Sequence, residues 1–330
     1  NNGVIIIETK TGSAGAPQVN LNIRTGIAQP IRGYDDFVIT DALQYHEVLK
    51  RSYENAGQTV PTNIYGDPNN PSIPNYIWPN DGTNQTTNVD ERSYSFPNNL
   101  IMPASSGTNW WDEVFGNALQ QNYNISVAGG SDNHNYNVSF NYLDQEGTAA
   151  YNRFQRGTVR VNTEFDLGMI TIGENISVAT EHTYGGNQGD PGGYAEGGII
   201  GKNILMQPVV PVKDINGWWA SGKAVGLGNQ SNPLKSAFYS KEGPSRNNRI
   251  FGNVFGRFDV QEKVLVTSRL GFNLNEGSYR FFNPVAPENS EPSFTNGIGE
   301  GNYVNTDWTW TNTLQYIDQF AGAHNVDVLV

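Results

Sequence analysis

Three pairs of carboxylates lie close enough in the sequence to act together in acid–base chemistry. They are Asp112 with Glu113, Asp144 with Glu146, and Glu288 with Glu291. A glycosidase uses two carboxylates in this way, one as the acid and the other as base or nucleophile. Carboxylates recur at such spacings in any chain, and no surrounding motif distinguishes one pair. We therefore predict no catalytic residues and no enzymatic activity.

The sequence offers little for a metal ion or a cofactor. Its four histidines, His46, His134, His182 and His324, lack the i, i+4 spacing of a metal-binding helix, and the chain has no cysteine. Two groups of Asp and Asn, at 67–70 and 187–190, could supply oxygen ligands to calcium, but neither follows the EF-hand pattern. We predict no metal site and no cofactor.

Aromatic residues outside the periodic segments are more informative. Aromatic rings stack on sugars or on peptide side chains, and neighbouring Asn, Asp and Gln groups can hydrogen-bond to hydroxyls and amides. We predict that substrate contacts come from Trp78, Trp110, Trp111, Tyr184, Trp218 and Trp219, and further loop aromatics are Tyr194, Phe281 and Phe282. The alternative is that these rings anchor the loops by packing.

Composition limits the fold class and the partners. The chain has 330 residues, of which 42 are Asn and 37 are Gly, a share that strands and loops tolerate and helices do not. The formal net charge is −12 and no run of Lys or Arg occurs, which argues against a nucleic-acid partner. Aromatic residues make up 12% of the chain, so the composition is not that of a disordered protein.

Strict alternation of apolar and polar residues predicts β-strands. In the clearest case Tyr136, Val138, Phe140 and Tyr142 alternate with Asn135, Asn137, Ser139 and Asn141. The same pattern occurs at 19–24, 122–127, 159–165, 170–178, 250–258, 264–274, 304–316 and 326–330. The sequence therefore predicts about nine strands, each with one apolar and one polar face.

Two architectures fit this alternation. In a soluble sandwich the apolar faces pack together, whereas in a membrane barrel they meet lipid and the polar faces line the interior. Several alternating runs last about 9–12 residues, which favours tilted membrane strands over sandwich strands of about 5–6 residues. No apolar window of about 18 residues predicts a transmembrane helix, but barrel strands would escape such a search.

Two very long connections interrupt the strands, at about 28–121 and 180–248. Connections of this length are functional or structured. A helical pattern runs from Asp41 to Tyr53 with Thr40 or Asp41 as N-cap, and the apolar segment from Ile199 to Met206 could form a second short helix. By contrast, the short segments near Gly130 and Gly168 predict tight turns.

The chain starts without Met or signal peptide and ends within an alternating run, so we expect it to be part of a longer protein. Its first segment, Gly3 to Gly12, resembles the last plug strand of SusC/RagA-type TonB-dependent outer-membrane transporters, with Glu8 where that family usually has Thr. Further segments resemble the same family in the expected order, namely 109–115, 121–130, 136–147, 156–162 and 208–218.

The resemblance implies a fold and a division of the chain. Residues 1–12 would be the last strand of a plug domain, and residues 13–330 would be the N-terminal portion of an antiparallel transmembrane β-barrel with long extracellular loops and a short loop helix. Such barrels have about 22 strands, so about nine strands could not close one. The polar faces, including Arg160, Asn162 and Glu164, would line the barrel interior.

The resemblance also implies a function. It predicts import of oligomeric nutrients, glycans or else peptides, across the outer membrane of a Gram-negative cell. The implied partners are a SusD-like surface lipoprotein, a TonB-type energy transducer reached through the plug, and outer-membrane lipid. From the residues alone, a secreted carbohydrate-binding or adhesin β-sandwich remains the alternative.

Overall fold

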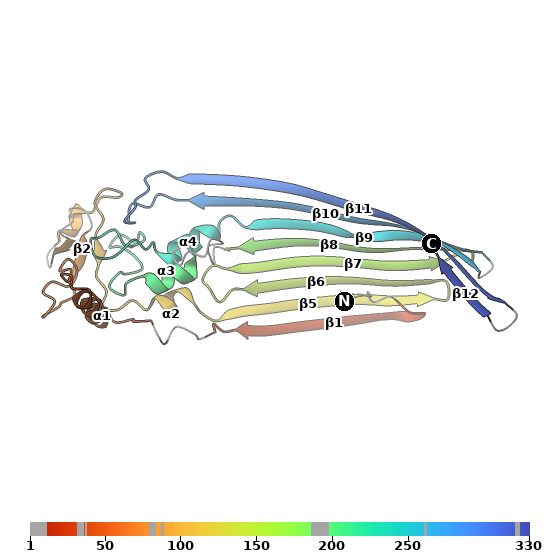
Figure 1. Cartoon of the computed structure of the whole chain (residues 1–330), viewed down its shortest axis with the longest axis horizontal. Coiled ribbons are helices and arrows are strands. Elements are labelled where there is room, and N and C mark those ends of the chain that lie inside the picture. The colour runs from red at the N-terminus through yellow and green to blue at the C-terminus, as the bar shows by residue number, and fades with distance from the viewer. Residues whose placement is uncertain are drawn as a thin grey trace.

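The computed structural model describes residues 12–31, 36, 38–78, 84–86, 89–185, 198–260, 263–320 and 324–330. Most of these residues form one antiparallel sheet of nine strands in the order β1, β5, β6, β7, β8, β9, β10, β11, β12 (Figure 1). The strands are β1 Gly15–Ala28, β5 Ala118–Ser131, β6 His134–Glu146, β7 Arg153–Asp166, β8 Ile170–Tyr184, β9 Ser245–Val260, β10 Val264–Asn283, β11 Gly297–Phe320 and β12 His324–Leu329. The predicted antiparallel β architecture is confirmed, and each alternating segment lies in one of these strands, except that Val330 follows the end of β12.

Connections at the two ends of the sheet differ greatly in length. At the turn end, two or three residues join β5 to β6 and β7 to β8. At the opposite end, which we call the loop end, β1 connects to β5 through residues 29–117, and β8 connects to β9 through residues 185–244 (Figure 1). Both long connections are shorter than the alternation indicated, because the flanking strands continue beyond their alternating segments.

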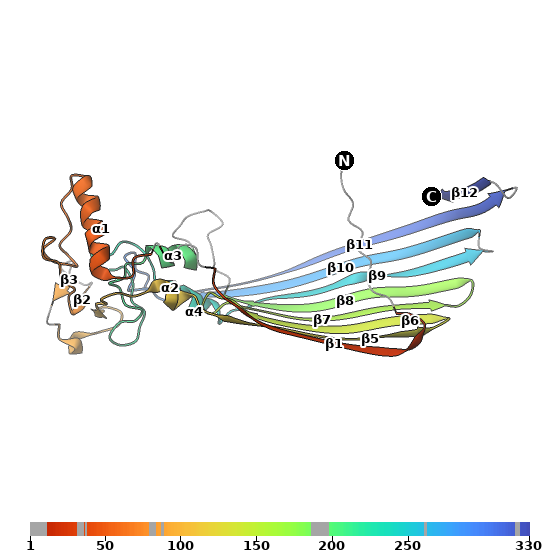
Figure 2. The same cartoon turned by 90° about the horizontal axis from the view of Figure 1, so that it is seen from below.

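The strand register places apolar side chains from every strand on one face of the sheet. One row across the sheet joins Leu21, Ile125, Phe140, Val159, Val178, Ile250 and Leu274. The neighbouring row on the other face carries Asn20, Ser126, Ser139, Arg160 and Ser177. We call these the apolar face and the polar face. Figure 2 shows the sheet as a curved wall.

The chain reaches β1 over the polar face. Ser13 and Ala14 border a cavity of about 690 Å³, whose other walls include polar-face residues of β1, β5 and β6, among them Asn22, Asn124 and Asn137. The segment preceding the first strand therefore approaches from the polar side. Except for Gly12, the predicted plug strand at residues 1–12 lies outside the described residues.

The helices and a small second sheet lie in the connections at the loop end (Figures 1 and 2). The helices are α1 Ala42–Asn55, α2 Trp110–Val114, α3 Ile199–Leu205 and α4 Pro233–Ser240, and the small sheet consists of β2 Tyr76–Trp78, β3 Asn84–Thr86 and β4 Met102–Pro103. The prediction for α1 is confirmed, since the Asp41 carboxylate accepts the Gln44 backbone N–H at 2.8 Å. The short helix predicted at Ile199 is α3. Helices α2 and α4 were not predicted.

The buried apolar cluster among the described residues lies entirely in these connections. Its members are Ala42, Ile64, Tyr65, Ile77, Met102, Trp110, Val114, Ala149, Ile199, Met206, Val209, Val210, Trp219, Ala220, Ala224, Leu227, Leu234 and Ala237. We call this packed region the loop body. The first and second long connections thus fold together into one body that stands beyond the loop end of the sheet.

A sandwich would need a second sheet over the apolar face. Within the described ranges, the second sheet is the short β2–β3–β4 unit, which lies in the loop body (Figure 1). The apolar face instead stays uncovered: Leu21 is 67% and Trp308 is 70% exposed. None of the helices in the described part of the chain is long and apolar enough to cross a membrane.

Candidate functional site

A cleft opens where the loop body meets the sheet. It has a volume of about 740 Å³ and lies between α4 and the loop end of β10. The side chains that border it include Lys202, Asn232, Lys235, Ser236, Tyr239, Tyr279, Phe281, Phe282 and Asn283. This volume and this mixture of aromatic and polar groups are typical of small-molecule binding sites.

Aromatic rings of β10 and β11 form a platform on the polar face beside the cleft. The register pairs Tyr279 with Gly301 and Phe281 with Gly299. In each case the ring lies so close to the glycine that an added Cβ would overlap it. Tyr279 and Phe281 are 50% and 49% exposed, so each ring packs one side on a glycine and leaves much of its surface open. Rings held in this way can stack on a ligand without being reordered.

Tyr303 extends the platform by the same arrangement, with the ring on β11 and the glycine on β10. This residue of β11 lies over Gly277 of β10, and its hydroxyl is 3.5 Å from Asn247 Oδ1. Asn247 Nδ2 in turn donates to Glu181 Oε2 at 3.2 Å. The platform therefore combines aromatic faces with amide and carboxylate groups at its edge.

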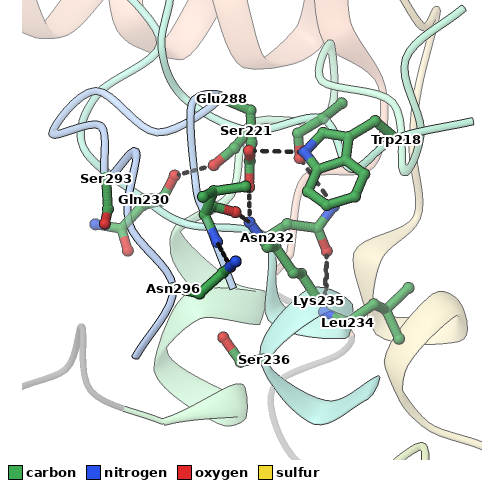
Figure 3. Close-up of polar contacts among 12 residues, drawn as sticks. Trp218, Ser221, Gln230, Asn232, Leu234, Lys235, Ser236, Glu288, Ser293 and Asn296 are labelled. Atoms are coloured by element: carbon green, nitrogen blue, oxygen red, sulfur yellow. Dashed lines mark hydrogen bonds and ion pairs between the residues drawn. The ribbon is translucent and has the colours of Figure 1, made fainter. Parts of the chain in front are cut away.

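A buried ion pair supports the cleft from the loop side. Lys235 of α4 donates to Glu288, in the connection between β10 and β11, and also to the Val285 carbonyl at 2.8 Å. The same Glu288 carboxylate accepts the Trp218 indole N–H at 2.9 Å (Figure 3). Burial lowers the pKa of Lys235, while Glu288 opposes that shift. This pair joins two connections that are far apart in the sequence.

The position of Lys235 depends on the cap of α4. Asn232 Oδ1 accepts the backbone N–H groups of Leu234 and Lys235 at 3.0 and 3.2 Å (Figure 3). The Asn232 side-chain amide donates to the carbonyls of Ala220 and Val212 at 2.8 and 3.0 Å. One asparagine thus starts the helix and fixes it to the preceding loop.

A second lysine borders the cleft from α3. Lys202 Nζ donates to Ser236 Oγ of α4 at 3.1 Å, and burial lowers the pKa of its ammonium group. Two cations with lowered pKa values therefore approach the cleft from the loop body. Neutral ligand groups such as hydroxyls and carbonyls can accept hydrogen bonds from such cations.

The structure separates the six predicted aromatic contacts into two groups. Trp110, Trp111 and Trp219 are buried in the loop body. Trp110 Nε1 donates to the Gln207 carbonyl at 3.2 Å, and the Trp111 ring packs on Phe115. Lys213 Nζ lies 3.1 Å from the centre of the Trp219 ring. These three indoles are therefore largely covered by neighbouring side chains.

The other three predicted contacts are partly exposed. Trp78 ends β2 and donates to Asn99, Tyr184 ends β8, and Trp218 contacts Phe96 and Glu288. Among the described aromatic residues that were predicted to lie in loops, Tyr184 lies in β8 and Phe281 and Phe282 lie in β10, so the prediction was wrong for these three. Tyr194 lies outside the described residues.

Sequence reasoning missed the platform and both lysines. The signal for the platform was the spacing of Gly299 and Gly301, which places two glycines on one face of β11 opposite Phe281 and Tyr279 of β10. No local signal marked Lys235, because its partner Glu288 is 53 residues away.

Two of the carboxylates considered for acid–base catalysis, Asp144 and Glu288, have structural partners. Asp144 binds Arg153 Nε at 2.8 Å and accepts Gln155 Nε2 at 3.1 Å, while Glu288 binds Lys235. Across the described ranges of the chain, His, Asp and Glu side chains form no group of three or more that could hold a metal ion.

Comparison with known sequences identifies relatives over nearly the whole chain, although no family model matches it. TonB-dependent receptor P26 of Formosa agariphila is 24% identical over 333 residues, which cover 99% of this chain and 29% of the receptor. The TonB-dependent receptor SusC of Bacteroides thetaiotaomicron is 24% identical over 353 residues, which cover 100% of this chain and 30% of SusC. The chain spans less than a third of the length of these curated relatives.

Solved structures agree with this result. The RagAB peptide transporter matches with a TM-score of 0.69 and 19% identity, over 97% of this chain and 35% of the matched chain. The RagAB peptide importer in its closed-closed state matches with a TM-score of 0.68 and 20% identity, over 97% and 35% of the two chains. Relatives along the sequence and a shared fold together confirm the predicted resemblance: this chain is similar to part of a SusC/RagA-type TonB-dependent transporter.

Proposed function

We propose that the chain is part of an outer-membrane transporter that imports oligomeric nutrients, with glycans as the favoured substrate class. Residues 1–12 would complete a plug domain, and residues 13–330 would form the N-terminal portion of the barrel wall. Substrate would bind on the polar side, and the loop body would face the outside of the cell.

The observation that carries this proposal is the uncovered apolar face of the nine-stranded sheet. In water, exposed apolar rows on every strand would be a strong drive to aggregate. In a bilayer the same apolar rows contact lipid acyl chains, and the polar face lines a water-filled interior. A carbohydrate-binding sandwich would bury these rows under a second sheet.

The approach of the chain to β1 supports the placement of a plug. Ser13 and Ala14 border the polar face near Asn22 and Asn124. A domain that precedes them in the chain would therefore start on the polar side of the wall. In a closed barrel that side is the interior.

Glycans are favoured by the chemistry of the platform and the cleft. The faces of Tyr279, Phe281 and Tyr303 can stack on the C–H faces of sugar rings. Lys202, Ser236 and Asn283 offer hydrogen bonds to hydroxyl groups at the border of the cleft. Of the six aromatic residues predicted from the sequence, we retain Trp78 and Trp218 as outer contacts and assign Trp110, Trp111 and Trp219 to packing. Tyr184 shares the apolar face of β8 with Val178 and is not retained as a substrate contact.

The partners are proposed from the relatives. The matched curated proteins are TonB-dependent receptors, and the matched structures are of RagAB, a peptide importer. We extend to this chain a TonB-type energy transducer, which would act through the plug, and a SusD-like surface lipoprotein, which would close over the loop body. Peptides are the second substrate class because RagAB imports them.

Uptake by the full-length transporter tests the proposal. Cells lacking the gene are grown either on defined neutral oligosaccharides or on peptides of matched length. They should fail to grow on the class of nutrient that the transporter imports, which we expect to be the oligosaccharides. The variant Y279A/F281A should bind the imported oligosaccharide about 10-fold more weakly, since each stacked ring contributes about 0.5–1.5 kcal/mol. Binding is measured by calorimetry on the purified transporter.

Trp308→Ala is the matched control, because that aromatic residue of β11 lies on the apolar face. It should leave binding unchanged. Transport of peptides alone would exclude the glycan assignment. Recovery of the full-length protein as a soluble product, with no shift in a heat-modifiability gel, would contradict the membrane function altogether.

A further inference from the structure

Toward the loop end of β9, β10 and β11, polar and charged side chains follow the main part of the apolar face, and the apolar pair of Phe282 and Ile298 lies beyond them. On β10 the apolar positions of this main part run from Val264 to Leu274. At about 3.4 Å per residue this segment is about 34 Å long, and a strand tilt of about 40° gives a height of about 26 Å. That height equals the apolar band of a membrane barrel, so the next residues toward the loop end would lie at the level of lipid headgroups.

Charged and polar side chains replace apolar ones at that level. The register places Arg246 of β9, Ser278 of β10 and Asn302 of β11 in one row, and Arg280 beside Glu300 in the next row. All five belong to the face that carries Ile250 and Leu274 farther down, because each is an even number of residues away from an apolar position on its own strand.

These five residues border a hollow of about 370 Å³, whose lining is completed by Gly243, Pro244, Tyr279 and Gly301. The Arg246 guanidinium makes no ion pair or hydrogen bond with any side chain that the structure describes. Arg280 Nη1 lies 3.7 Å from Glu300 Oε1, and both side chains are more than half exposed. An exposed pair at this distance is weak, so the Arg280 guanidinium stays available to another anion.

We propose that this hollow binds a phosphate group in the headgroup of an outer-leaflet lipid. Two guanidinium groups can hold phosphate through paired hydrogen bonds, and Ser278 and Asn302 can donate further ones. The position at the upper limit of the apolar face aligns such a phosphate with the acyl chains that would cover Leu274 and Ile250. The inference rests on the membrane placement in the proposed function.

The test uses the full-length transporter in nanodiscs of phosphatidylcholine, of phosphatidylcholine with lipid A, and of phosphatidylcholine with dephosphorylated lipid A. Lipid retained after transfer to detergent is measured by native mass spectrometry. The wild type should retain lipid A, and R246Q/R280Q should retain about 10-fold less. The wild type should retain dephosphorylated lipid A weakly, to the same extent as R246Q/R280Q retains lipid A.

Arg249→Gln is the matched control, since this arginine of β9 lies on the polar face and donates to Asn273. It should retain lipid A like the wild type. Equal retention by R246Q/R280Q and the wild type would overturn the inference. So would tight binding of inorganic phosphate to the detergent-solubilised protein without retention of lipid A, which would indicate a site for a free ion.

Membrane fractionation of the same variants separates this inference from the proposed function. A full-length protein that is found in the outer membrane and takes up substrate, but whose R246Q/R280Q variant retains lipid A normally, keeps its transport role and loses the lipid site. A protein recovered outside the membrane would overturn both.

Discussion

The nine-stranded sheet and the loop body use apolar side chains in opposite ways. In the loop body these side chains are buried against one another, as Trp110 shows with 1% exposure. In the sheet they stand on an uncovered face, and hydrogen bonds between neighbouring strands hold the wall together. The two regions thus keep apolar side chains from water in different ways. In the loop body the side chains pack against one another, and in the sheet, in our proposal, they contact lipid.

This difference predicts that the two regions fail independently. A cavity in the loop body should loosen the connections and leave the wall intact. A charge on the apolar face should harm the wall and leave the packing of the loop body unchanged. Three substitutions in the full-length protein, in order of decreasing effect, test this separation.

Trp110→Ala should have the largest effect, confined to the loop body. The indole is fully buried and donates to the Gln207 carbonyl. The backbone carbonyl of Trp110 accepts a hydrogen bond from the Asn203 side chain. Its loss should destabilise the loop body by about 3–5 kcal/mol. Hydrogen exchange of α2 and α3 measures the change. The control Trp310→Ala, on the apolar face, should leave that exchange unaltered. If the amides of α2 and α3 were equally protected in both variants, the loop body would have no core of its own.

Leu270→Arg should destabilise the wall by about 2–4 kcal/mol, because it places a cation near the middle of the apolar face. The temperature at which the barrel unfolds in a heat-modifiability gel reports this loss. Thr309→Arg is the matched control, since Thr309 pairs with Gly271 at nearly the same depth on the polar face. If both variants unfolded at the wild-type temperature, the apolar face would not be facing lipid.

Tyr94→Phe should have the smallest effect, about 1.5–3 kcal/mol, again in the loop body. The Tyr94 hydroxyl donates to the Asp214 carboxylate at 2.7 Å and joins the first long connection to the second. Burial and this hydrogen bond raise the pKa of Tyr94. Limited proteolysis of the two connections should therefore become faster in the variant at pH 7. Unchanged cleavage would mean that apolar packing alone joins them.

The sheet was predictable because its information is local. Alternation with a period of two is visible within each strand, as at Tyr136 to Tyr142, and it fixes which residues share a face. The ends of strands were less visible. In β11 the segment Gly297–Gly301 has glycine at every second position and only one apolar side chain, Ile298, and aromatic rings of β10 cover Gly299 and Gly301.

The candidate site was mostly not predictable, because its parts come from separate connections. Trp218, Lys235 and Glu288 meet through contacts across 53 to 70 residues of sequence. Aromatic content identified Trp110 and Trp218 equally, and only packing distinguishes the buried indole from the partly exposed one. Resemblance to a transporter family predicted the architecture, but the relatives specify no residue contacts in this cleft.

The placement of the two- and three-residue turns at one end of the sheet limits how this wall could change in evolution. A strand removed singly would reverse the direction of every later strand and carry the following loops to the turn end. A hairpin such as β6 with β7, removed whole, would preserve both the direction of the remaining strands and the alternation of their faces. The hairpin, rather than the strand, is therefore the smallest unit by which a wall of this kind can widen or narrow.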